Sequence, residues 1–218
     1  MWSFLPAGLL PVPALLAALP PDLRTAPVDV IARLGSSMGH SLVSNLLVVV
    51  AIMGALGVTT AHKTGALPRA LVFEAWPLVL GTRALSTTAA ASVVGAVSVL
   101  AMDVTFRAGS GEAIFSLATA MSTVAVTGAA GLWGFLLGVL IRNPLLVLFV
   151  VPATLLPGQV MADVAPDVAH LLPSGAQIAL SGLAPTELDA GAVVGALAGW
   201  TLALGLTACL VSSRRDGA

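Results

Sequence analysis

The sequence predicts an all-α polytopic membrane protein, a single transmembrane domain over residues 1–218 with about six transmembrane helices. Charged residues make up 9% of the 218 residues and hydrophobic residues 58%, whereas a soluble domain carries roughly 25% charged residues. The mean hydropathy is +1.03. The few charges lie between long apolar stretches, and an apolar run of about 20 residues spans the bilayer core as a helix.

The apolar stretches define the expected spans and the connections between them. The spans are predicted at about 3–19, 41–61, 83–103, 113–141, 145–162 and 190–211. The first carries three prolines but has no Lys or Arg ahead of it, so it does not resemble a signal peptide. Before the second span, Val28–Leu34 fits a short interfacial helix.

Two connections are expected to contain short helices of their own. The stretch 63–80 is broken by Pro68 and Pro77, which favours a short helix along the membrane surface over a span. The connection 163–189 has an apolar centre, Val168–Leu183, and this centre is predicted to re-enter the membrane edge without crossing it.

Local patterns predict how the third and fourth spans end. Asp103 and Arg107 lie four residues apart with the acid first, which favours an ion pair at a helix end. A turn follows at Ala108–Gly111. Arg142-Asn143-Pro144 predicts a second, sharp turn after the fourth span.

The distribution of basic residues predicts that both termini are cytoplasmic. Cytoplasmic loops of membrane proteins carry an excess of Lys and Arg. With six spans and cytoplasmic termini, the basic residues on the cytoplasmic side are Lys63, Arg69, Arg83, Arg142, Arg214 and Arg215. Only Arg24, Arg33 and Arg107 are then outside, and the inverted topology would reverse this bias.

Motifs that would indicate an enzyme are incomplete. Gly57–Thr64 misses a P-loop because His62 replaces the required glycine and the segment lies in a predicted membrane helix. Gly35–Gly39 matches a nucleophile-elbow spacing, but a helix-capping turn before the second span fits better. The histidines (His40, His62 and His170) are expected in connections and too dispersed for a metal site. We expect no catalytic residue, metal or cofactor in this chain.

Small residues recur at four-residue spacing in two spans. Gly134 and Gly138 share one face of the fourth span, and Gly191, Gly195 and Gly199 share one face of the last span. Such faces let helix backbones approach closely. They fit either packing within the bundle, which we favour, or an interface with another subunit.

The spans hold no strongly ionisable side chain near the bilayer centre, which argues against an ion-coupled carrier or a channel. A pathway lined mainly by hydroxyl-bearing and apolar residues suits an amphipathic or lipid-like cargo.

The layout resembles the membrane subunits of ABC transporters of the type-2 exporter class. Four stretches carry the resemblance: His62–Leu67 after the second span, Trp76–Arg83 leading into the third, Gly134–Pro144 at the end of the fourth, and Leu172-Pro173 late in the outer connection. Permeases of this class have six spans, a cytoplasmic coupling helix between spans two and three, and re-entrant helices between spans five and six.

The resemblance implies a permease subunit in the cytoplasmic (inner) membrane, with ATP and Mg²⁺ bound by a separate cytoplasmic ATPase dimer. A second permease chain, identical or different, would complete the pathway. The coupling residues would be Lys63, Arg69, Phe73, Glu74 and Trp76, and the residues proposed to contact cargo are Asn45, Thr154 and Gln159.

An alternative is a non-transporting scaffold, or an accessory or immunity subunit of a larger membrane complex. It is favoured by Ala61 and His62, which stand where the exporter class usually carries an acidic residue before the coupling helix. A lipid-modifying enzyme ranks last, because the sequence offers no cluster of acid and base residues.

Overall fold

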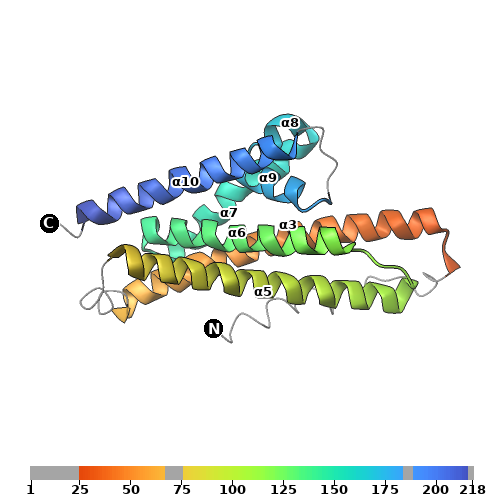
Figure 1. The fold of residues 1–218 in the computed structure, drawn as a ribbon, viewed down its shortest axis with the longest axis horizontal. Helices are drawn as coiled ribbons and strands as arrows, with labels where there is room; N and C mark the ends of the chain where they lie inside the picture. Colours follow the sequence, from red (N-terminus) through yellow and green to blue (C-terminus); the bar gives the residue numbers. More distant parts are fainter. Residues whose placement is uncertain (1–24, 67–75, 184–188, 216–218) are drawn as a thin grey trace.

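The computed structural model describes residues 25–66, 76–183 and 189–215, and the regular elements in these ranges are all helices. The long helices are α3 (Val28–Lys63), α5 (Trp76–Ser110), α6 (Leu117–Ile141) and α10 (Ala190–Arg215) (Figure 1). Each contains a segment long and apolar enough to cross a membrane. Between α6 and α10 lie the 17-residue α7 (Pro144–Val160) and three short helices, η3 (Met161–Asp163), α8 (Pro166–Ala169) and α9 (Pro173–Leu180).

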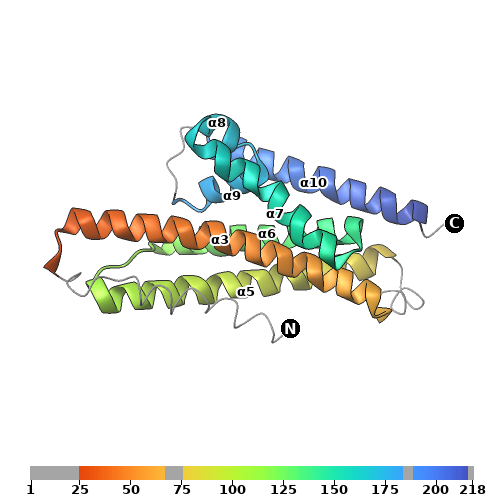
Figure 2. The ribbon, with the colours of Figure 1, turned by 180° about the vertical axis from the view of Figure 1, so that it is seen from behind.

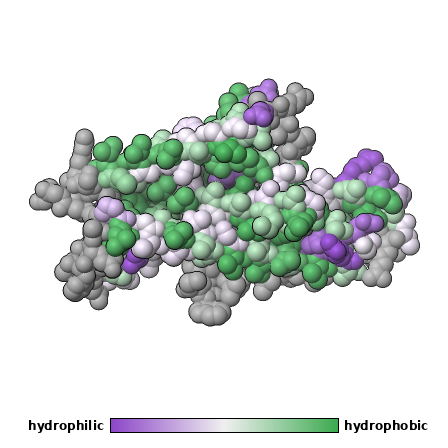
Figure 3. Space-filling view, in the orientation of Figure 1, coloured by the Kyte–Doolittle hydropathy of each residue, from purple (hydrophilic) through white to green (hydrophobic). Residues whose placement is uncertain are grey.

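The surface of the bundle agrees with a protein embedded in a membrane. Large apolar side chains are exposed along the long helices, including Leu100 at 64%, Leu202 at 66% and Leu206 at 65%. Hydrophobic residues dominate the middle of the visible face, and hydrophilic residues gather toward its ends (Figure 3). An exposed apolar surface of this extent indicates contact with lipid or with another protein.

Helix α3 is one continuous helix of 36 residues. It contains the predicted span 41–61 but begins well before it. The separate interfacial helix predicted at 28–34 is therefore wrong, and so is the helix-capping turn predicted at Gly35–Gly39. His40 and His62, expected in connections, also lie within α3.

The N-terminal half of α3 stays helical because one stripe of it is buried. Ile31, Gly35 and Gly39 recur every four residues and face the end of α5 and the segment after it. A Cβ on Gly35 would lie 3.3 Å from the Phe106 ring, and one on Gly39 would lie 3.2 Å from Ile114. The polar residues that suggested a connection occupy the opposite, exposed face.

Helix α5 has 35 residues and extends the predicted span 83–103 at both ends. Trp76 to Leu80, expected in the surface helix 63–80, instead form the start of α5. Pro77 is tolerated there because the first turn of a helix needs no intrahelical N–H donor. Residues 67–75 and the predicted first span 3–19 lie outside the described residues.

Helix α6 packs against both α3 and α5 and is the centre of the bundle (Figure 2). Its glycines allow this close contact. A Cβ on Gly134 would overlap the backbone of Ala51 in α3, and one on Gly138 would lie 2.6 Å from the Ala55 carbonyl oxygen. Gly131 faces the side chain of Ala91 in α5.

The connection between α5 and α6 is held by Asp103. Its Oδ2 accepts a hydrogen bond from Arg107 Nε at 2.7 Å, the ion pair predicted from the sequence. Its Oδ1 accepts hydrogen bonds from the backbone N–H groups of Ile114 (2.9 Å) and Phe115 (3.3 Å). One carboxylate thus joins the last turns of α5 to the segment that enters α6.

The predicted turn at Arg142–Pro144 is confirmed. Arg142 adopts a left-handed backbone conformation with φ of 54° and ends α6. The Asn143 side chain then accepts a hydrogen bond from the Leu145 N–H at 3.0 Å, and Pro144 occupies the first turn of α7.

The chain returns from α7 to α10 through short helices, and α9 is buried between its neighbours. Gly158 in α7 lies against Ser174 and Gly175 in α9, and the Ser174 hydroxyl donates to the Leu155 carbonyl. Trp200 Nε1 in α10 donates to the Leu171 carbonyl at 2.9 Å. These contacts fix α9 against both long neighbours before α10 runs back along the bundle (Figure 1).

Candidate functional site

The two ends of the bundle differ in charge and in their connections. One end holds the end of α3, the start of α5, the α6–α7 turn and the C-terminus (Figure 1). The basic residues toward this end are Lys63, Arg83, Arg142, Arg214 and Arg215. At the opposite end, the last turns of α5 hold Asp103 and Arg107, and the α5–α6 connection holds Glu112. Among the described residues, most of the basic ones therefore lie at one end, which we call the basic end.

The predicted coupling residues are only partly described. Lys63 is the exposed last residue of α3, and Trp76 is the first residue of α5, so both lie at the basic end. Arg69, Phe73 and Glu74 lie outside the described residues. The two described positions flank the connection from α3 to α5.

The predicted cargo contacts are not brought together. Asn45 lies on the exposed side of α3, where its Nδ2 donates to the Ser41 carbonyl at 2.9 Å. Thr154 in α7 accepts a hydrogen bond from Trp133 Nε1 at 3.2 Å, so its hydroxyl already links α7 to α6. Gln159 is half-buried near the end of α7. Within the described ranges, no hydrogen bond or packed cluster joins the three.

The two glycine stripes differ in their surroundings. Gly134 and Gly138 lie at the contact of α6 with α3, as described above. In contrast, no atom of the described residues lies within 4 Å of a Cβ built on Gly195 or Gly199, and Gly191 faces only the Asp189 carboxylate. Packing of this glycine stripe within the bundle, favoured from the spacing, is not found among the described residues. An interface with another subunit remains the other interpretation of this stripe.

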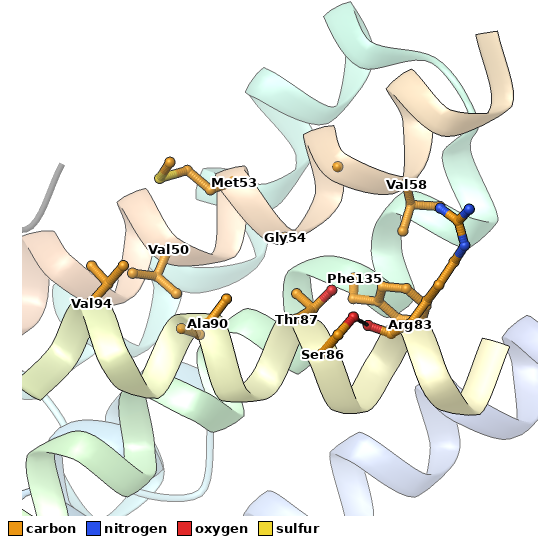
Figure 4. A pocket seen from close by; sticks show the side chains of 12 residues that line it. Val50, Met53, Gly54, Val58, Arg83, Ser86, Thr87, Ala90, Val94 and Phe135 are labelled. Atoms are coloured by element: carbon orange, nitrogen blue, oxygen red, sulfur yellow. Dashed lines mark hydrogen bonds between the residues drawn. The ribbon is translucent and has the colours of Figure 1, made fainter. Parts of the chain in front are cut away.

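A crevice of about 210 Å³ between α3 and α5 was not expected from the sequence. It is lined on α5 by Arg83, Ser86, Thr87, Ala90, Ala91 and Val94, and on α3 by Val50, Met53, Gly54, Gly57 and Val58. Phe135 of α6 lines it between the two helices (Figure 4). We call this the α3–α5 crevice. The sequence pattern that could have indicated the crevice is the spacing of Arg83, Ser86, Thr87 and Ala90, which places these residues on one helix face.

A second feature missed from the sequence is a buried amide in α9. Gln177 has no exposed surface, and neither atom of its side-chain amide has a hydrogen-bond partner in the described part of the chain. Burying an unpaired amide is costly, so α9 is held in place by the packing of its neighbours and not by this side chain. Nothing in the sequence around Gln177 indicated that its side-chain amide would be buried without a partner.

Comparison of the chain with models of protein families, with curated proteins and with solved structures found no match.

Proposed function

We propose that this chain is the membrane-spanning permease subunit of an ATP-driven ABC exporter of the type-2 class. It would move an amphipathic or lipid-like cargo out of the cytoplasm. The observation that carries the proposal is the return of the chain between α7 and α10. α7 leads into the short α8 and α9, α9 is buried against α7 and α10, and α10 runs back to the basic end. Permeases of this class have short re-entrant helices at the same point of the chain.

The connection between α3 and α5 supports the same proposal. It joins two long helices at the basic end, where Lys63 and Trp76 flank it. A coupling helix between spans two and three would occupy this position and contact a cytoplasmic ATPase. Because basic residues favour the cytoplasmic side, the end that carries them suits this contact.

In this proposal the membrane domain has six spans, of which residues 3–19 form the first, and both termini are cytoplasmic in the inner membrane. A separate ATPase dimer binds ATP and Mg²⁺ at the basic end. A second permease chain, identical or different, completes the pathway. Cargo moves when ATP-driven closure of the ATPase rocks the helices attached to the α3–α5 connection.

The proposal is tested by affinity purification of the tagged full-length chain from membranes of its native host in mild detergent. We expect a soluble ATPase to co-purify and the eluate to hydrolyse ATP. The double variant Glu74→Ala/Trp76→Ala should lower the recovered ATPase activity by about tenfold or more, because few residues carry most of the binding energy at an interface.

The matched control is Glu112→Ala, an exposed acidic residue at the opposite end of the bundle. It should leave the recovered ATPase activity unchanged. A preparation without ATPase activity, in a detergent that preserves such complexes, would contradict the exporter proposal. Equal activity from the double variant would instead refute the coupling surface and favour a scaffold or accessory subunit.

A further inference from the structure

The α3–α5 crevice is polar at one end and apolar at the other. At its polar end, Arg83 reaches from α5 toward Val58 of α3, with Ser86 and Thr87 on the next turn (Figure 4). At the other end, the lining residues include Val50, Met53 and Val94. The polar end lies toward the basic end of the bundle, because α3 runs toward that end at Val58 and α5 has just begun at Arg83.

Arg83 carries a charge that the described residues do not neutralise. Within these residues, the ion pairs join Arg33 to Asp29 and Arg107 to Asp103, and Arg83 takes part in neither. Arg83 is half-buried and lines the crevice together with apolar side chains. A cation near the bilayer is costly unless it reaches water or binds an anion. The crevice therefore favours a negatively charged group beside Arg83.

One hydroxyl group near Arg83, that of Thr87, adds to this preference. Ser86 Oγ donates to the Arg83 carbonyl at 2.9 Å, so its hydroxyl hydrogen is already used within its own helix. Thr87 lines the crevice, and its hydroxyl makes no hydrogen bond within the described part of the chain. A guanidinium fork with a hydroxyl donor one turn away suits the oxygens of a phosphate.

The length of the crevice matches one acyl chain. Arg83 and Val94, at its two ends on α5, are separated by roughly 16 Å along the helix axis at 1.5 Å per residue. Half of the hydrocarbon core of a bilayer is about 15 Å thick. A lipid with its headgroup at Arg83 would thus lay one chain along the small and apolar residues of the crevice.

We propose that the α3–α5 crevice binds an anionic phospholipid, with the headgroup phosphate held by Arg83 and Thr87 and one acyl chain lying between α3 and α5. Basic pockets between membrane helices near the cytoplasmic surface suit anionic headgroups. This site does not depend on the exporter proposal, because it rests on the described helices alone.

The test uses the full-length chain in nanodiscs of phosphatidylcholine, with and without phosphatidylglycerol, and with inorganic phosphate added to phosphatidylcholine alone. Retained phosphatidylglycerol is counted by native mass spectrometry, and thermal unfolding is followed by tryptophan fluorescence. We expect phosphatidylglycerol to raise the unfolding temperature of the wild type. Arg83→Gln should weaken the binding by about ten- to a hundredfold, the value of a charge-assisted hydrogen bond.

A second variant tests the same site in case Arg83→Gln does not fold. No described atom lies within 4 Å of a Cβ built on Gly57, so Gly57→Leu can fill the crevice without overlapping the backbone. It should abolish the response to phosphatidylglycerol. The matched controls are Lys63→Gln, an exposed cation outside the crevice, and Gly195→Leu, an open glycine on α10; both should respond as the wild type does.

Two results would overturn the proposal. The first is an equal response of the wild type, Arg83→Gln and Gly57→Leu to phosphatidylglycerol, which would place the lipid elsewhere on the bundle. The second is a response to inorganic phosphate with no further effect of phosphatidylglycerol, which would assign the crevice to a free anion.

Discussion

Replacing Gly134 by alanine is expected to lower the free energy of unfolding by about 2 kcal/mol. The added Cβ would overlap the backbone of Ala51, so α3 and α6 would have to move apart. Alanine favours a helix over glycine by roughly 1 kcal/mol, but overpacking of a rigid backbone contact outweighs this gain. The contact lies at the centre of the bundle, and its loss affects every helix that packs on α6.

The measurement is thermal unfolding of the purified chain in detergent, followed by tryptophan fluorescence. Gly195→Ala is the matched control, because a Cβ at Gly195 meets no described atom. This control should be as stable as the wild type or slightly more stable. If Gly134→Ala unfolds at the wild-type temperature, α3 and α6 do not cross as closely as described.

Replacing Asp103 by alanine is expected to lower the free energy of unfolding by about 2–3 kcal/mol. The side chain of Asp103 is 16% exposed, and its carboxylate accepts hydrogen bonds from Arg107 and from the N–H groups of Ile114 and Phe115. Removing it leaves two backbone donors without their acceptor and frees the segment that leads into α6. The unfolding temperature should fall, and the α5–α6 connection should become accessible to proteases.

Comparing variants separates the contribution of the Arg107 ion pair to stability from that of the backbone hydrogen bonds of Asp103. Arg107→Ala removes only the ion pair, and because the Arg107 side chain is 56% exposed it should cost less than about 1 kcal/mol. Asp29→Ala removes a surface pair whose side chains are 83% and 61% exposed, and should cost about 0.5 kcal/mol or less. Equal losses for Asp103→Ala and Arg107→Ala would show that the backbone hydrogen bonds contribute nothing.

Apolar runs and turn residues predicted those helices and turns whose bounds are set by neighbouring residues in the sequence. The turn at Arg142–Pro144 follows from the proline and the capping asparagine, and α10 begins at Ala190 as expected. The early start of α3 could not be predicted, because Asp29, Arg33 and His40 make the segment polar on average. Only the position of Phe106 and Ile114 beside Gly35 and Gly39 gives that segment a buried face.

The candidate site was predicted less completely, for a related reason. The α3–α5 crevice depends on how far α6 holds α3 and α5 apart, which no single helix sequence reveals. Arg83 was recognised only as a basic residue near the start of a span, and its place beside Val58 follows from tertiary packing. Likewise, the spacing of Gly134 and Gly195 is the same kind of signal, yet only Gly134 meets another described helix.

The exporter proposal requires that the connection between α3 and α5 faces the cytoplasm, where it can meet an ATPase. It is tested by labelling single cysteines with a membrane-impermeant maleimide, in a Cys209→Ser background that removes the one native cysteine. Glu112→Cys should be labelled in intact cells, and Thr64→Cys only after the membrane is permeabilised. Labelling of Thr64→Cys from outside, with Glu112→Cys protected, would contradict the topology and with it the exporter proposal.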